Sequence, residues 1–142
     1  MKRAGWRAQV VKAPRERVFE AWNDCEAWPR WSVAFTRVTV TERAGNTKYL
    51  DAELEVEGRP IHRTEKHVLT RPELVQVEGV MAGAPNTTEW KFDAVADGTL
   101  LTAVMEAPLD EWINILGPSA ESQVGILLGE ELLAFARYVE SQ

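Results

Sequence analysis

Cysteine is almost absent from this sequence: Cys25 is the only one among 142 residues. A single cysteine excludes an intramolecular disulfide and any metal site built from several thiolates. No stretch approaches the roughly 20 apolar residues of a membrane-spanning helix. The N-terminus, MKRAGWRAQVV, also lacks the apolar run of a secretory signal peptide. We therefore expect a cytoplasmic protein without stable membrane insertion.

Positive charge is scarce as well. The chain has 16 Lys and Arg residues against 22 Asp and Glu residues, which gives a net charge of -6. Binding to phosphate backbones needs clustered Lys and Arg side chains, and the sequence has no such cluster. Nucleic acid is therefore not an expected partner.

The common short motifs of metal, nucleotide and nucleophile sites are missing. The sequence contains no HExxH, CxxC, EF-hand, P-loop, GxGxxG or GxSxG pattern. The two histidines, His62 and His67, lie on one expected strand at positions of opposite parity, so they face opposite sides of a sheet and cannot share a metal ion. We expect no metal and no cofactor, and we interpret Cys25 as a small apolar filler.

What is present is the pattern of a single α+β domain over residues 1–142. The sequence predicts a strand over Arg7–Ala13, then a short helix over 14–23 and a second helical stub or turn in the segment DCEAWPRW, residues 24–31. Between residues 35 and 107, turn signals separate six β-rich runs. A long amphipathic helix ends the chain. Because an apolar sheet face must be covered, this order predicts a seven-stranded curved antiparallel sheet with the C-terminal helix as its cover.

The segment Tyr49–Leu69 predicts which side chains face the core. A two-residue hairpin turn at Gly58-Arg59 pairs Val56 with Ile61. One face then carries complementary charges, and the other carries aliphatic side chains with a polar strip of the form R-x-E-x-H. The strip consists of Arg63, Glu65 and His67.

Two interpretations of the polar strip are open, because burying charged groups costs several kcal/mol unless they are paired. In the structural one, Arg63 and Glu65 form an ion pair near the sheet edge and His67 is bonded to a backbone carbonyl. In the functional one, the strip faces a cavity and its polar groups point at a ligand.

The next strand and the last helix leave similar alternatives open. In strand 74–81 the apolar set at 75, 77, 79 and 81 favours one inward face, whereas inward Gln76 and Glu78 would bring Glu78 near Arg63. In the final helix, Gly125 and Gly129 each cost roughly 1 kcal/mol relative to Ala. They indicate either close packing of helix on sheet or space for a ligand beneath the helix.

Several segments together carry a resemblance to a known superfamily. They are APRERVFEAWNDCEAWPRW after the first strand, Trp90-Lys91-Phe92, the turn Asp97-Gly98-Thr99 and the long C-terminal helix. With these, the chain resembles the START-like or helix-grip (SRPBCC) superfamily, and within it the polyketide cyclase/dehydrase (aromatase/cyclase) group. The resemblance implies a helix-grip fold with a cavity between sheet and helix. It also implies a hydrophobic or aromatic small-molecule ligand, while the oligomeric state stays open.

The resemblance also bears on the polar strip. In aromatase/cyclases the strand after the hairpin carries an inward W-x-S-x-R pattern, whose positions fall on Arg63, Glu65 and His67, all with different identities. As an enzyme, the protein would cyclise or dehydrate a polyketide-like substrate, with His67 as base, Glu65 as its orienting group or the acid, and Arg63 at the developing oxyanion.

Two other functions are compatible with the same fold. One is a non-catalytic carrier of a lipid or quinone, and the other is a protein-interaction module with a collapsed cavity. Of the two tryptophans in DCEAWPRW, we expect one to fill the core and Trp31 to face the cavity. The expected ligand-binding residues are Trp28, Trp31, Phe35, Leu54, Trp90, Phe92, Met105, Val124 and Leu128.

Overall fold

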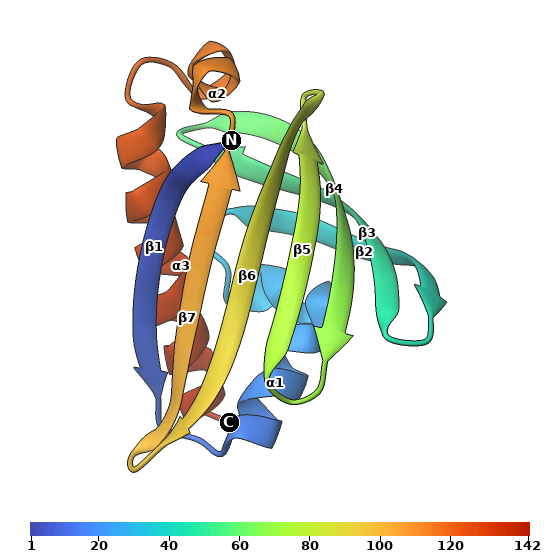
Figure 1. Cartoon of the computed structure of the whole chain (residues 1–142), viewed down its shortest axis with the longest axis vertical. Helices are drawn as coiled ribbons and strands as arrows, with labels where there is room; N and C mark the ends of the chain where they lie inside the picture. Colours follow the sequence, from blue (N-terminus) through green and yellow to red (C-terminus); the bar gives the residue numbers. More distant parts are fainter.

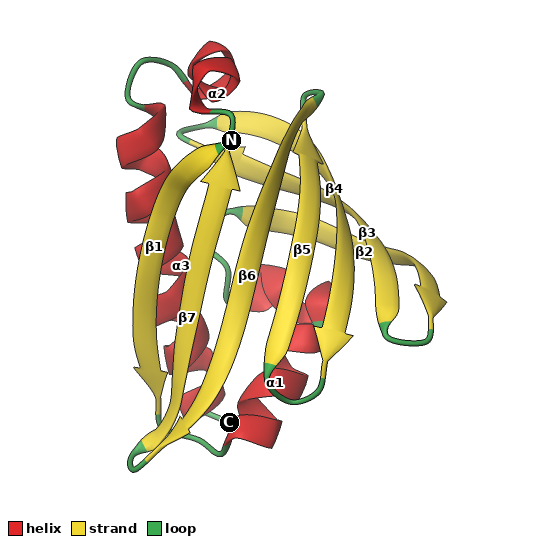
Figure 2. Ribbon diagram, viewed as in Figure 1, coloured by secondary structure: helices red, strands yellow, loops and turns green.

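The protein is an α+β fold in which one curved antiparallel sheet wraps around the last helix, as Figures 1 and 2 show for this computed structural model of residues 1–142. The strand order is β1-β7-β6-β5-β4-β3-β2. The strands are β1 (Lys2–Val11), β2 (Phe35–Ala44), β3 (Thr47–Val56), β4 (Arg59–Thr70), β5 (Leu74–Met81), β6 (Ala84–Val95) and β7 (Gly98–Ala107). The helices are α1 (Arg15–Asn23), the 3-10 helix η1 (Cys25–Arg30), α2 (Leu109–Leu116) and α3 (Ala120–Glu140). The predicted helix-grip arrangement is confirmed.

The helices occupy different parts of the concave side. In Figure 1, α3 runs along β1 and β7, while α1 and α2 lie at opposite ends of the sheet. None of the helices is both long enough and apolar enough to cross a membrane. The sheet and α3 together form the two walls between which a site can lie.

Two elements differ from the sequence-based expectation. Strand β1 begins at Lys2 rather than at Arg7, and α2 was not expected at all. The signal for α2 is present, since Leu109, Trp112 and Leu116 recur at helical spacing behind Pro108. Trp112 and Leu116 are buried, so α2 packs as an amphipathic lid over one end of the sheet.

The register predicted for the hairpin of β3 and β4 was wrong by two residues. The turn is Glu57-Gly58, with φ angles of 50° and 78°, as a type I′ hairpin turn requires. Val56 therefore pairs with Arg59, and Leu54 rather than Val56 pairs with Ile61. Because the error is an even number of residues, every side chain keeps its predicted face.

Strand β5 presents its apolar set to the core, which settles the alternative left open by the sequence. Val75, Val77, Gly79 and Met81 are buried, and Gln76 and Glu78 are exposed. The inward Gly79 leaves a gap among the side chains that cover this face of the sheet.

The apolar interior divides into two clusters of side chains. The larger gathers Phe19, Trp22, Phe92 and Phe135 between α1, the sheet and the C-terminal half of α3. The smaller gathers around Trp112 and Leu116 of α2. Phe35 packs against both, so the space between the two clusters is where a ligand site can form.

The two helix glycines face β1 and not the cavity. A Cβ added at Gly125 would lie 2.9 Å from Nη2 of Arg7, and one added at Gly129 would lie 3.7 Å from Nε of the same side chain. The close-packing interpretation therefore describes these glycines, because they let Arg7 lie against α3.

Gly129→Ala is expected to raise the free energy of unfolding by up to about 1 kcal/mol, since Ala is the better helix former and 3.7 Å is an ordinary contact. Urea denaturation measures the change. Gly98→Ala is the opposing control, because Gly98 has φ of 141° and its added Cβ would lie 2.2 Å from the Val11 carbonyl oxygen. A destabilised Gly129→Ala variant would contradict the prediction.

Candidate functional site

A cavity lies between the concave face of the sheet and α3, with α2 and η1 contributing to its ends. It is lined by 21 residues, of which 16 are hydrophobic. The empty space between the walls is about 920 Å³ with the open mouth included, and the centres of water molecules can occupy about 120 Å³ of it. An engineered cavity of about 150 Å³ holds one benzene ring, so the space enclosed here is of single-ring size.

Eight of the nine expected ligand-binding residues line this cavity. They are Trp28, Trp31, Phe35, Leu54, Trp90, Met105, Val124 and Leu128. Phe92 does not line it, because its ring is fully buried against Phe19, at a centroid distance of 5.0 Å, and against Trp22, at 6.3 Å. Further lining residues that the sequence pattern did not indicate include Trp22, Trp112, Leu116 and Leu127.

The two tryptophans of the DCEAWPRW segment take different positions. Trp28 is 4% exposed, and its indole N–H donates to the Trp22 carbonyl oxygen at 2.8 Å. Trp31 is half-buried and packs on Phe135 with a centroid distance of 5.1 Å. Both rings reach the cavity wall, so Trp28 fills the core and also contributes to the wall.

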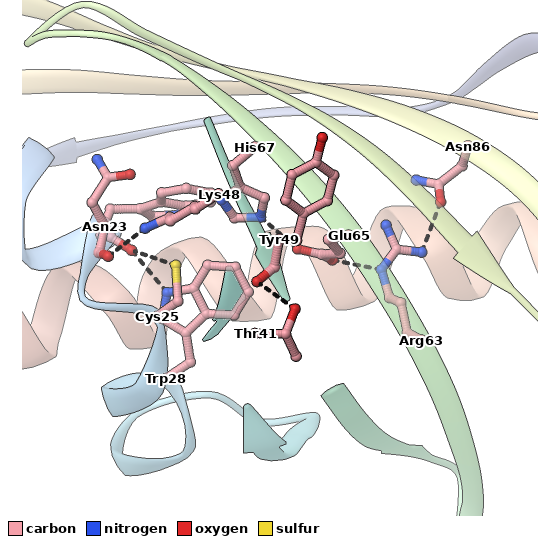
Figure 3. A network of polar contacts seen from close by, with 11 residues as sticks. Asn23, Cys25, Trp28, Thr41, Lys48, Tyr49, Arg63, Glu65, His67 and Asn86 are labelled. Carbon is pink, nitrogen blue, oxygen red and sulfur yellow. Dashed lines mark hydrogen bonds and ion pairs between the residues drawn. The ribbon is translucent and has the colours of Figure 1, made fainter. Parts of the chain in front are cut away.

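A string of buried polar groups crosses the floor of the sheet from β6 to the middle of β4 (Figure 3). Arg63 donates from Nη1 to Asn86 Oδ1 at 2.7 Å and from Nε to Glu65 Oε2 at 2.6 Å. His67 Nε2 lies 2.7 Å from Glu65 Oε1. The ion pair therefore sits in the middle of the sheet rather than at its edge, and His67 bonds to Glu65 rather than to a backbone carbonyl.

Gly79 makes this geometry possible. It lies on β5 between Glu65 of β4 and Asn86 of β6 in the strand register. A Cβ at this position would lie 2.0 Å from Arg63 Nη2 and 2.8 Å from Asn86 Oδ1. The guanidinium thus lies flat across β5, in the gap that the missing side chain leaves.

Only part of the R-x-E-x-H strip reaches the cavity. Arg63 and Glu65 line it, but His67 does not. The His67 side chain is 0% exposed, with its ring stacked on Trp22 at 5.4 Å and tilted against Trp28 at 5.8 Å. The expected direct contact between His67 and a substrate is therefore corrected, because two indole rings cover the imidazole.

The carboxylate of Glu65 is the electrostatic centre of the string. Burial by itself raises its pKa, but the charge of Arg63 and the hydrogen bonds from His67 and Arg63 outweigh burial and lower the pKa to about 2. Glu65 is therefore ionised at neutral pH, and both of its oxygens are occupied by protein donors.

A second buried carboxylate, Glu131 of α3, was missed because the helical pattern assigns it to a polar face. Glu131 lines the cavity and accepts hydrogen bonds from the Ser32 hydroxyl at 2.7 Å and from the backbone amides of Val33 and Ala34 at 2.8 and 3.1 Å. Burial raises the pKa of this carboxyl, and these hydrogen bonds oppose the rise. Glu131 therefore holds the Ser32–Ala34 strap, part of the cavity wall, against α3.

Cys25 and Lys48 lie behind the tryptophans. Burial raises the pKa of the Cys25 thiol to about 12 despite the opposing charge of Lys48, so the thiol is a poor nucleophile. Lys48 is 3% exposed and donates to the Asn23 carbonyl oxygen at 2.6 Å. Neither side chain lines the cavity, and no group of three or more His, Cys, Asp or Glu side chains is placed to hold a metal ion.

Comparisons with known proteins agree with this architecture. A sequence profile of the family described as polyketide cyclase / dehydrase and lipid transport matches residues 7–140. No curated protein matches the chain.

Several solved structures have similar folds. TTHA0849 from Thermus thermophilus is 14% identical with a TM-score of 0.84, over 96% of this chain and 97% of that one. The Zhui aromatase/cyclase from a Streptomyces species is 14% identical with a TM-score of 0.76, over 95% and 92%. A START superfamily protein from Mycobacterium smegmatis is 17% identical with a TM-score of 0.75, over 96% of both chains.

Proposed function

Because this chain belongs to the polyketide cyclase/dehydrase and lipid transport family, we propose that it binds a hydrophobic or aromatic small molecule in the cavity between the sheet and α3. The observation that carries the proposal is the composition of the cavity wall, where 16 of 21 residues are hydrophobic. Small-molecule sites are apolar clefts in which a few polar groups fix the orientation of the ligand. Arg63 and Glu65 are the buried ion pair that supplies such groups here.

The size of the enclosed space supports a ligand with one ring, or one end of a longer molecule, inside the walls. A longer molecule extends through the open mouth or displaces α2, which closes one end of the cavity with Trp112 and Leu116.

Cyclisation or dehydration of a polyketide-like substrate is the second candidate, favoured by the polar string from Asn86 to His67. Such chemistry needs a base in contact with the carbon acid. Glu65 lines the cavity, but its pKa of about 2 makes it a weak base, and His67 is covered. In the catalytic function, Arg63 binds the developing oxyanion, and His67 acts only through Glu65. We therefore rank ligand binding before catalysis.

Uptake of the uncharged fluorescent probe N-phenyl-1-naphthylamine tests the binding function. We expect saturable uptake by the wild-type protein and its loss in Met105→Trp, which fills the cavity from β7 with a larger side chain. Thermal unfolding of the variant shows that the fold is retained. Absence of uptake by the wild type would contradict the proposal and favour the interaction module.

Incubation with a small-molecule extract of the source organism separates carrier from enzyme. A carrier retains a hydrophobic compound that mass spectrometry recovers unchanged. An enzyme releases a compound that has lost water or cyclised, and only in the presence of the protein. The Met105→Trp variant is the control for both results.

A further inference from the structure

We propose that the polar end of the ligand is an uncharged oxygen, as in a ketone, quinone or ether, and that this oxygen accepts a hydrogen bond from Arg63 Nη2 on the floor of the cavity. The same cavity rejects carboxylates. This inference rests on the proposed binding function and specifies the class of ligand. The observation behind it is that some polar atoms of the cavity wall already have hydrogen-bond partners within the protein, whereas others have none.

The free polar atom at the centre of the floor is a donor. Arg63 is 6% exposed and lines the cavity. Two of its nitrogens are engaged, Nε by Glu65 and Nη1 by Asn86. The third, Nη2, makes no hydrogen bond within the protein, as Figure 3 shows. It lies over Gly79, where the sheet offers no side chain to cover it.

The buried carboxylate acceptors of the wall are already used. Both oxygens of Glu65 receive protein donors. Glu131 Oε1 accepts from two backbone amides, and the two Glu131 oxygens share the single proton of the Ser32 hydroxyl. Two further lining residues, Trp31 and Trp112, have buried indole N–H groups without a partner. Thr88 can donate or accept, and the Gln123 amide oxygen, beside the start of α3, is a further acceptor without a protein partner. The indole N–H groups of Trp31 and Trp112 are closed off from the cavity, so Arg63 Nη2 is the charged donor left to match an oxygen acceptor on the ligand.

The charges in and around the wall cancel, which decides between a neutral and an anionic ligand. Arg63 is paired with Glu65 at 2.6 Å. The other buried cation, Lys48, points to the Asn23 carbonyl and does not line the cavity, whereas the carboxylate of Glu131 does. A carboxylate ligand would lose its hydration in an apolar cavity without a free cation to replace it. A neutral oxygen meets Nη2 without that cost.

Equilibrium dialysis with three two-ring probes tests the inference. The probes are chromone, which has ketone and ether oxygens, naphthalene, which has the same ring framework without them, and the anion 1-naphthoate. We expect chromone to bind the wild-type protein about tenfold or more tighter than naphthalene, the size of effect of a hydrogen bond to a charged donor. We expect 1-naphthoate to bind more weakly than naphthalene.

A paired variant assigns the preference to Arg63. Arg63→Met with Glu65→Leu removes both charges together, so that neither is left buried without its partner. We expect naphthalene to bind it still, with the tenfold preference for chromone lost. Lys66→Met with Glu78→Leu is the matched control, because these two residues face each other on β4 and β5 on the outer side of the sheet. This control should keep the preference.

The outcomes separate this inference from the binding function beneath it. Equal binding of chromone and naphthalene overturns the role of Nη2 and leaves cavity binding intact. Binding of 1-naphthoate that is tighter than the binding of naphthalene overturns the exclusion of carboxylates. Binding of none of the three probes contradicts the binding function and the inference together.

Discussion

Glu65→Gln is expected to lower the free energy of unfolding by about 3–5 kcal/mol at neutral pH, the usual cost of leaving a buried charge without its partner. Gln keeps the shape of the side chain but removes the negative charge, which lies 2.6 Å from Arg63 Nε and 2.7 Å from His67 Nε2. The guanidinium then stays buried without a counter-charge. Urea denaturation of the wild type and the variant at pH 7 measures the difference.

The pH dependence of this difference identifies its cause. Folding lowers the pKa of Glu65 from 4.5 to about 2. The ionised carboxylate therefore stabilises the fold fully above about pH 5, and this contribution is lost as the pH falls towards 2. The gap between wild type and Glu65→Gln should narrow over the same range.

Glu78→Gln is the matched control for this measurement. Glu78 lies on β5 with its side chain on the outer, exposed face, so its substitution should change stability by no more than about 0.5 kcal/mol. A Glu65→Gln effect no larger than that of the control would contradict the prediction. So would a gap of equal size at pH 7 and pH 3.

Gly79→Ala is expected to lower the free energy of unfolding by about 3 kcal/mol, although Ala is ordinarily favoured over Gly inside a strand by roughly 0.5–1 kcal/mol. The new Cβ would lie 2.0 Å from Arg63 Nη2 and 2.5 Å from Cζ, so the guanidinium must leave the gap over β5. Its hydrogen bonds to Asn86 and Glu65 are then broken or distorted, and buried partners remain unsatisfied. Urea denaturation measures the loss.

Two comparisons show whether the loss comes from Arg63. Gly5→Ala is the matched control, since its added Cβ would meet the Leu128 and Val124 side chains at 3.5 Å and the Gly125 Cα at 3.8 Å, all ordinary contacts, and it should be nearly neutral. Asn86→Ala should destabilise the wild type but have little further effect in Gly79→Ala, because the contact is already lost there. Additive effects of Gly79→Ala and Asn86→Ala would contradict the proposed role of the glycine.

The fold was predictable because its signals are local or periodic. Period-two alternation and turn residues marked the strands, and helical spacing marked the last helix. The faces of β4 survived a wrong turn at Gly58-Arg59, because an error of two residues preserves parity. The helix α2 was overlooked although Leu109, Trp112 and Leu116 have the right spacing, since a segment of eight residues after a strand is easily taken for a loop.

The site was predictable only in outline, because its details depend on side chains far apart in the sequence. The strip pattern placed Arg63 and Glu65 on the cavity side, but nothing in it indicates that Trp22 and Trp28 cover His67. Glu131 looked like a solvent-facing helix residue until its partners, the strap amides, were known. An inward glycine in strand 74–81 was a usable signal, since glycine inside a strand marks close approach by another group.

The strap of residues 32–34 and its anchor on α3 are 97 to 99 positions apart, which has a consequence for biosynthesis. Chains are made from the N-terminus onwards, so the strap leaves the ribosome long before Glu131 exists. Until α3 has been translated, the concave face of the sheet has neither its cover nor the carboxylate that fixes its rim. The pocket is therefore the last part of the molecule to be completed, and the nascent chain is the stage at which its apolar lining is open to chaperones and to other chains.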